Sequence, residues 1–87
     1  MSEYFHVHRG TFDPQGEITI GDELIRWGFL NVEDACQEAT GKVIDYPPGT
    51  VLIVLGESPR RILFRIYVAS DGGLHAWRTH DYPAWAP

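Results

Sequence analysis

Residues 50–55, which read Thr-Val-Leu-Ile-Val-Leu, decide the fold because they are apolar on both alternating sides. Such a run predicts a central strand that is covered on both faces. After it, residues 61–69 alternate in polarity, the Asp-Gly-Gly at 71–73 predicts a turn, and residues 74–79 predict a returning strand. Residues 50–79 therefore indicate an antiparallel β-meander. In its middle strand, one face is expected to hold Ile62, Phe64, Ile66 and Val68, and the other Arg61, Leu63, Arg65 and Tyr67.

Residues 31–40 predict the one clear helix of the chain. Asn31 is a favoured N-cap residue, and acidic side chains follow it in the first turn, where the helix dipole favours anions. Gly41 is expected to end the helix in a left-handed conformation. The spacing i, i+3, i+4, i+7 predicts one narrow apolar stripe that packs on a sheet, made of Val32, Ala35, Cys36 and Ala39.

The segment before this helix predicts further strands. Residues 4–8 alternate, with Phe5 and Val7 toward the core, and residues 10–16 predict a loop. Residues 17–27 favour a hairpin that turns at Gly21-Asp22, with a short helix from Asp22 as the alternative. The whole chain, residues 1–87, is thus expected to be a single α+β domain. Its mainly antiparallel sheet of five or six strands, or partly open barrel, carries one helix and ends in an aromatic and proline-rich tail at 80–87.

Composition and charge restrict the function classes. The 87 residues carry a net charge of −5, and residues 1–45 hold nine acidic against three basic side chains. This charge argues against non-specific nucleic-acid binding. The longest apolar run is too short for a membrane span, and the first residues do not resemble a signal peptide. With a single cysteine, Cys36, no internal disulfide forms, and a cytoplasmic location is expected.

The leading hypothesis is a small acidic, non-catalytic interaction protein. It would bind, and inhibit or regulate, a larger protein or nucleoprotein partner with a basic surface, as antitoxins and phage anti-defence inhibitors do. The sequence leaves the oligomeric state open, a homodimer included. The attracting acids would be Asp22, Glu23, Glu33, Glu38 and Asp45, and the aromatic anchors Trp27, Tyr82 and Trp85. For Tyr82 and Trp85, the proline-rich tail favours folding back to cover a sheet edge or the mouth of the core, and a docking surface is the other interpretation.

Other residues suggest binding chemistry of other kinds. His6 and His8 stand at i and i+2 of one strand, a spacing from which two imidazoles reach one metal ion, although a solvated strand face also explains them. Arg61, Arg65 and Arg78 are candidates for an anion site, with pairing to nearby acids as the alternative. The sequence predicts no catalytic residue and no cofactor. Cys36 is expected to be an inert core residue.

The first half of the chain resembles the small ADP-ribosyltransferase-like domains of the rifampicin ADP-ribosyltransferase type. The resemblance rests on Tyr4-Phe5-His6, on Gly21-Asp22-Glu23-Leu24 and on the alanine-containing helix that follows Phe29-Leu30. It implies a reduced NAD-binding domain in which His6 holds the nicotinamide ribose. Arg9 and Glu57 would complete this small-ligand site.

Overall fold

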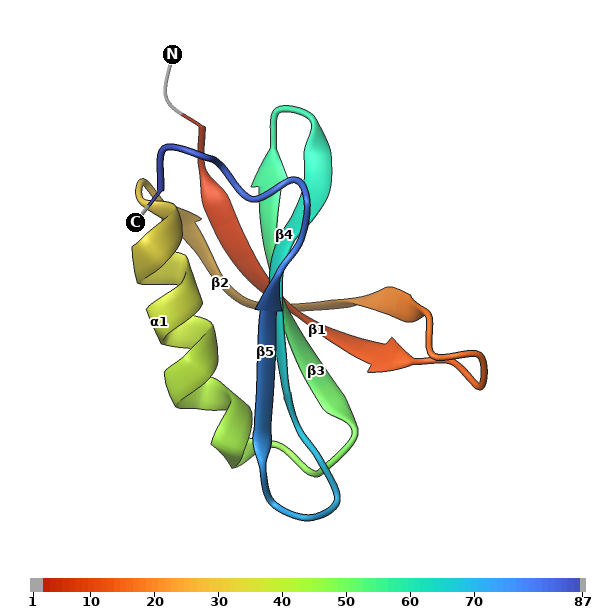
Figure 1. Ribbon diagram of the computed structural model, residues 1–87. Helices are drawn as coiled ribbons and strands as arrows, with labels where there is room; N and C mark the ends of the chain where they lie inside the picture. Colours follow the sequence, from red (N-terminus) through yellow and green to blue (C-terminus); the bar gives the residue numbers. More distant parts are fainter. Residues whose placement is uncertain (1–2, 87) are drawn as a thin grey trace.

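The computed structural model describes residues 3–86 and shows a five-stranded antiparallel sheet with one helix packed on it (Figure 1). The strand order is β2-β1-β3-β4-β5, so β3 lies in the middle, as the apolar run at 50–55 predicted. No helix in the described part of the chain is long and apolar enough to cross a membrane. The elements are β1 (Phe5–Phe12), β2 (Ile18–Phe29), α1 (Val32–Lys42), the 3-10 turn η1 (Val43–Asp45), β3 (Thr50–Glu57), β4 (Arg60–Val68) and β5 (Leu74–Arg78).

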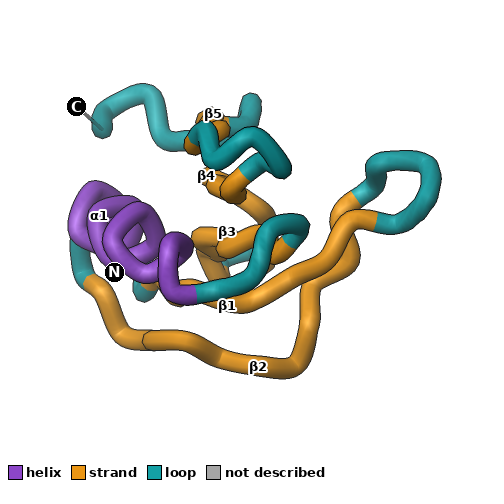
Figure 2. The backbone as a smooth tube through the Cα atoms, turned by 90° about the horizontal axis from the view of Figure 1, so that it is seen from below, coloured by secondary structure: helices purple, strands orange, loops and turns teal. Residues whose placement is uncertain are grey.

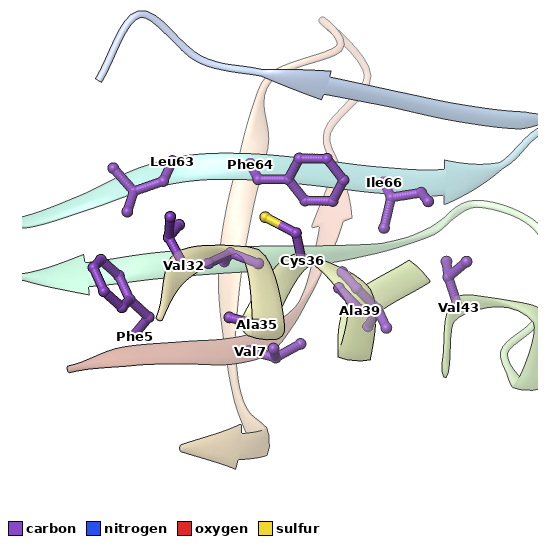
Figure 3. Close-up of a cluster of buried hydrophobic side chains, with 12 residues drawn as sticks. Phe5, Val7, Val32, Ala35, Cys36, Ala39, Val43, Leu63, Phe64 and Ile66 are labelled. Atoms are coloured by element: carbon purple, nitrogen blue, oxygen red, sulfur yellow. The ribbon is translucent and has the colours of Figure 1, made fainter. Parts of the chain in front are cut away.

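The main core lies between α1 and one face of the sheet (Figure 3). The predicted stripe of α1 is buried, and β1 points Phe5 and Val7 toward it, as expected. The small side chains of the stripe let the helix approach the sheet closely, and the strands supply the volume. The buried residues of this core are Phe5, Val7, Val32, Ala35, Cys36, Ala39, Val43, Leu52, Val54, Leu63, Phe64 and Ile66.

The two ends of α1 differ in how well the sequence predicted them. Asn31 is the N-cap, and its side chain accepts a hydrogen bond from the backbone N–H of Glu33 at 2.7 Å. The prediction that Gly41 ends the helix is wrong, because Gly41 lies inside α1 and has no positive φ. Val43 is 1% exposed in the core, and its N–H still bonds the carbonyl of Ala39. The backbone therefore stays helical past Gly41 and passes directly from α1 into η1, which places Val43 in the core.

The opposite face of the sheet has a second, smaller core. Val51, Ile53 and Leu55 are fully buried there, although no helix of the described residues lies on this side. The far end of the β1–β2 hairpin projects to the side opposite α1 (Figure 2) and packs Phe12, Ile18 and Ile20 against them. A Cβ at Gly10 would lie 2.8 Å from the carbonyl oxygen of Thr19 on β2 and 2.6 Å from Cδ1 of Ile53, so glycine lets β1 lie this close to β2 and to the Ile53 side chain.

The predicted hairpin at Gly21-Asp22, and the alternative short helix there, are both wrong. Residues 18–29 form one continuous strand, and the turn lies earlier, where the N–H of Gly16 bonds the carbonyl of Asp13 at 2.9 Å. Strand β1 correspondingly runs on through Gly10, which was expected to begin the loop. Gly21 serves a close approach instead of a turn, because a Cβ there would lie 2.7 Å from the carbonyl oxygen of Arg9.

A bulge in β4 corrects the predicted alternation of that strand. Val54 pairs with Phe64, but Leu55 pairs with Ile62, so Leu63 is an extra residue with no partner of its own on β3. Leu63 consequently joins Phe64 in the main core, and Ile62 packs with the smaller core. Ile62 and Phe64, which were predicted to share one face of β4, therefore point to opposite faces of the sheet.

Candidate functional site

The edge strand β2 carries the largest exposed apolar side chains near a hollow of the surface. Trp27 is 66% exposed and Leu24 is 45% exposed. Together with His6 and His8 of β1, they line a hollow of about 260 Å³. Because β2 pairs with β1 alone, these side chains stand at an open edge of the sheet.

Acidic side chains flank this apolar pair. Leu24 also lines a second hollow, of about 590 Å³, together with Glu23, Lys42, Asp45 and Tyr46. The hydroxyl of Tyr46 donates a hydrogen bond to Glu23 at 3.4 Å, and burial together with this carboxylate raises the pKa of Tyr46. We call Asp22, Glu23, Leu24, Trp27 and Asp45 the β2 surface.

The acids of the β2 surface differ in how they are neutralised. Oε1 of Glu23 lies 3.7 Å from Nη1 of Arg9, whose guanidinium also lies over the ring of Tyr46 at 5.0 Å. Asp22 and Asp45 are exposed, and within residues 3–86 no basic side chain comes within 4.0 Å of either carboxylate. Their charge is therefore the part available to a partner.

The two histidines of β1 bond the backbone of β2 through the same ring atom in opposite roles. Nδ1 of His6 accepts a hydrogen bond from the N–H of Gly28 at 3.2 Å. Nδ1 of His8 lies 3.4 Å from the carbonyl oxygen of Gly21, to which it can only donate. In each ring Nδ1 is thus occupied, and within the described chain no three metal-ligating side chains come together.

The three residues of the predicted NAD site do not share one face of the sheet. Nε2 of His6 lies 3.6 Å from Oε1 of Glu57, and the ring of Trp27 lies beside it, with the ring centres 6.2 Å apart. Arg9 pairs with Leu52 of the main core and reaches Glu23 and Tyr46 on that side, whereas His6 pairs with Leu55 of the smaller core. The structure therefore brings together His6 and Glu57 and leaves Arg9 apart.

The predicted anchors and acids of the helix and tail form a separate group. Oε1 of Glu33 accepts hydrogen bonds from Arg78 and from the hydroxyl of Tyr82, each at 3.0 Å. Tyr82 is half-buried against the main core, so it folds back as the sequence favoured, while Trp85 remains 69% exposed. Glu38 belongs to the other side of the helix, where its carboxylate lies 3.9 Å from Arg26 of β2.

Cys36 takes no part in any of these surfaces as a reactive group. It is 7% exposed within the main core, and this burial raises the pKa of its thiol to about 11. At neutral pH the thiol is therefore protonated and weakly nucleophilic, as predicted for a core cysteine.

The three candidate anion-binding arginines line one open hollow of about 560 Å³ but are engaged differently. Both Nη atoms of Arg61 bond the carboxylate of Glu3, one of them at 3.0 Å, and Arg78 bonds Glu33. The guanidinium of Arg65 instead lies 4.2 Å from the ring centre of Trp77. Because of the bulge at Leu63, Arg61 and Arg65 leave β4 toward opposite faces.

Sequence reasoning missed two residues that shape these surfaces. Leu24 precedes Ile25 in a strand, and since neighbouring side chains alternate, one of the two had to face outward. Glu3 gave no signal, because its partner Arg61 is 58 residues away along the chain.

Comparison of this chain with protein-family models, with curated proteins and with solved structures finds no match, so neither the family nor the function follows from a relative.

Proposed function

We propose that this chain is a non-catalytic interaction protein of the cytoplasm, which binds a larger partner with a basic surface and thereby inhibits or regulates it. The observation that carries the proposal is the exposure of two apolar side chains of the edge strand β2. Trp27 and Leu24 are both exposed and line the same hollow. Tryptophan is a large apolar side chain that is highly buried on average. It is strongly enriched among the interface residues that dominate binding energy. Trp27 would be the anchor.

The charge of the chain supports a basic partner. The net charge is −5, and Asp22 and Asp45 are acids of the β2 surface with no basic side chain within 4.0 Å in the described chain, although Lys42 lines the same hollow as Asp45. Such acids attract a positively charged surface over several ångströms and raise the rate of association. Glu33 and Glu38, by contrast, are already paired with arginines and contribute less.

The open edge of the sheet supports the same location. Strand β2 has 12 residues and a neighbour on one side alone, so its outer edge offers backbone groups as well as side chains. A partner segment that lies along such an edge gains main-chain hydrogen bonds in addition to contacts with Trp27.

The test is affinity capture from a lysate of the native host at low and at high salt, with four versions of the chain. Wild type and Trp85→Ser should retain the same stoichiometric partner at low salt, because Trp85 is equally exposed but lies outside the β2 surface. Trp27→Ser should lose the partner, and Asp22→Lys/Asp45→Lys should reduce its capture at least tenfold, a loss of about 1.4 kcal/mol. Retention by all four versions, or capture independent of salt, would contradict the proposal.

A second candidate function is binding of a small ligand at His6 and Glu57. The observation that favours it is their approach to 3.6 Å beside the ring of Trp27. The resemblance to ADP-ribosyltransferase-like domains suggests NAD as the first ligand to test. Saturation-transfer NMR should show contact with NAD that is lost in His6→Ala, and an equal signal in that variant would rule this candidate out. A zinc titration with and without chelator tests the metal alternative at His6 and His8.

A further inference from the structure

The hollow at the end of β4 and β5 is a second surface with chemistry of its own. β5 continues directly into the tail, which turns back over this end of the sheet (Figure 1). Three arginines contribute to the walls, whereas the acids that hold two of them, Glu3 and Glu33, are not lining residues. The lining residues are Arg61, Ile62, Arg65, Trp77, Arg78, Thr79, His80 and Asp81.

Arg65 differs from the other two arginines because its charge has no counterpart. Within residues 3–86, no carboxylate lies within 4.0 Å of its guanidinium. Its Nε is buried and has no hydrogen-bond acceptor in the described chain. A buried donor without an acceptor is unfavourable, so the observed conformation leaves binding capacity unused.

Aromatic stacking fixes where this guanidinium lies. Its carbon is 4.2 Å from the ring centre of Trp77, which meets Tyr67 edge-on at 5.8 Å. Tyr67 is in turn stacked on His75 at 5.1 Å. This row of rings leaves the guanidinium little freedom to move away from the hollow, and an Arg held on an aromatic face keeps its planar N–H groups for an oxyanion.

We propose that this hollow binds the phosphate group of a small phosphomonoester, with Arg65 as the principal ligand and Arg61 and Arg78 at the rim. A phosphate carries about −1.5 to −2 charges at neutral pH and three acceptor oxygens, which suits guanidinium groups that line one hollow from two strands. Nε of Arg65 gains its missing acceptor when the guanidinium rotates in place on the ring of Trp77 toward the anion. Asp81 also lines the hollow, and its negative charge stabilises the cation of Arg61 at the rim, whereas no carboxylate of the described chain lies within 4.0 Å of the guanidinium of Arg65.

The test is an NMR titration that follows the indole N–H of Trp77 and the Nε–H of Arg65. Inorganic phosphate and AMP are the probes, and adenosine and acetate are the controls. Saturable shifts with both phosphates, and none with the controls, are expected. Phosphate and AMP of equal affinity indicate that the free anion suffices, whereas tighter AMP indicates a nucleotide-like phosphomonoester.

Three variants decide whether Arg65 is responsible. Arg65→Met keeps the apolar stem and should weaken binding about tenfold, the effect of one charge-assisted contact. Arg65→Lys keeps the charge without the planar fork and should recover part of this loss. Arg60→Met removes an exposed charge of the same strand and should change the affinity less than about twofold. Shifts that persist in Arg65→Met, or that acetate reproduces, would overturn the proposal.

Discussion

The two faces of the sheet both bury apolar side chains of β3, but different elements cover them. On one face, α1 covers Leu52, Val54 and the rest of the main core. On the other face, Ile53 and its neighbours are equally buried, but their cover is the curled end of the β1–β2 hairpin (Figure 2). The first cover depends on local helix signals, and the second depends on two glycines that allow strands to approach closely. The comparison teaches that burial alone does not reveal which element provides it.

The largest effects are expected from the adjacent pair Leu52 and Ile53, which point to opposite faces of β3 and are both fully buried. Leu52→Ala and Ile53→Ala should each lower the free energy of unfolding by about 2–5 kcal/mol, through lost burial and an unfilled cavity. Urea denaturation of the two variants measures this. A loss below about 1 kcal/mol for Ile53→Ala alone would show that the hairpin end does not cover its face in solution.

Gly→Ala substitutions are expected to change the free energy of unfolding by a smaller amount, with opposite sign in the β1–β2 hairpin and in α1. Gly10→Ala places a Cβ against Ile53 and the carbonyl of Thr19, at 2.6 and 2.8 Å, and should destabilise by about 1–3 kcal/mol. Gly41→Ala meets nothing within 4 Å inside α1 and should stabilise by about 0.5–1 kcal/mol. Thermal unfolding of both variants gives the two signs, and stabilisation by Gly10→Ala would refute the close approach of β1 to Thr19 and Ile53.

The ion pair between Glu3 and Arg61 predicts a pH-dependent contribution. Hydrogen bonds from Arg61 hold the pKa of Glu3 below its ordinary value of 4.5. A lowered pKa in the folded state means that the stabilisation is present above pH 4.5 and is lost as the pH falls through the folded-state pKa. Glu3→Gln should therefore lower the free energy of unfolding by about 1 kcal/mol at neutral pH, with a difference from wild type that vanishes in acid.

Denaturation of wild type and variant at several pH values measures this difference. Glu17→Gln, at an exposed position next to the β1–β2 turn, is the control and should show little change at any pH. A deficit of Glu3→Gln that stays constant into acid would show that the carboxylate charge is not its source.

The smallest effect is expected at the tail, which covers an edge of the main core. Tyr82→Phe removes the hydroxyl that bonds Glu33 but keeps the ring, so a loss of about 0.5–1.5 kcal/mol is expected. Trp85→Ala, at a side chain that is 69% exposed, should stay within about 0.5 kcal/mol of wild type. Equal losses from both variants would mean that the tail packs through Trp85 as well.

The sequence predicted those elements whose signals are local. The cap and apolar stripe of α1, the doubly apolar β3 and the turn at Asp71 each lie within a few residues, and each is present. The errors arose where contacts between residues far apart in the sequence determine which local conformation forms. Gly21 resembled a turn residue because nothing in the sequence shows that Arg9 lies against it. The bulge in β4 places Leu63 in the main core, and this too depends on contacts with other elements.

The candidate sites were harder to predict for the same reason. An acidic side chain is available to a partner when no cation neighbours it, and those neighbours come from remote parts of the chain. Glu33 is neutralised by Arg78, 45 residues away, whereas Asp22 is not. Trp27 could be named as an anchor from its residue type, but its exposure follows from the position of β2 at the edge of the sheet.

The opposite roles of the two histidine Nδ1 atoms assign a different tautomer to each ring. The ring of His8, which donates to the carbonyl of Gly21, carries its proton on Nδ1. The ring of His6 accepts at Nδ1 from the N–H of Gly28, so its proton lies on Nε2, the atom 3.6 Å from Oε1 of Glu57. Two imidazoles on one strand are therefore opposite tautomers, and β2 is held to β1 by one ring that donates a proton and one that accepts it.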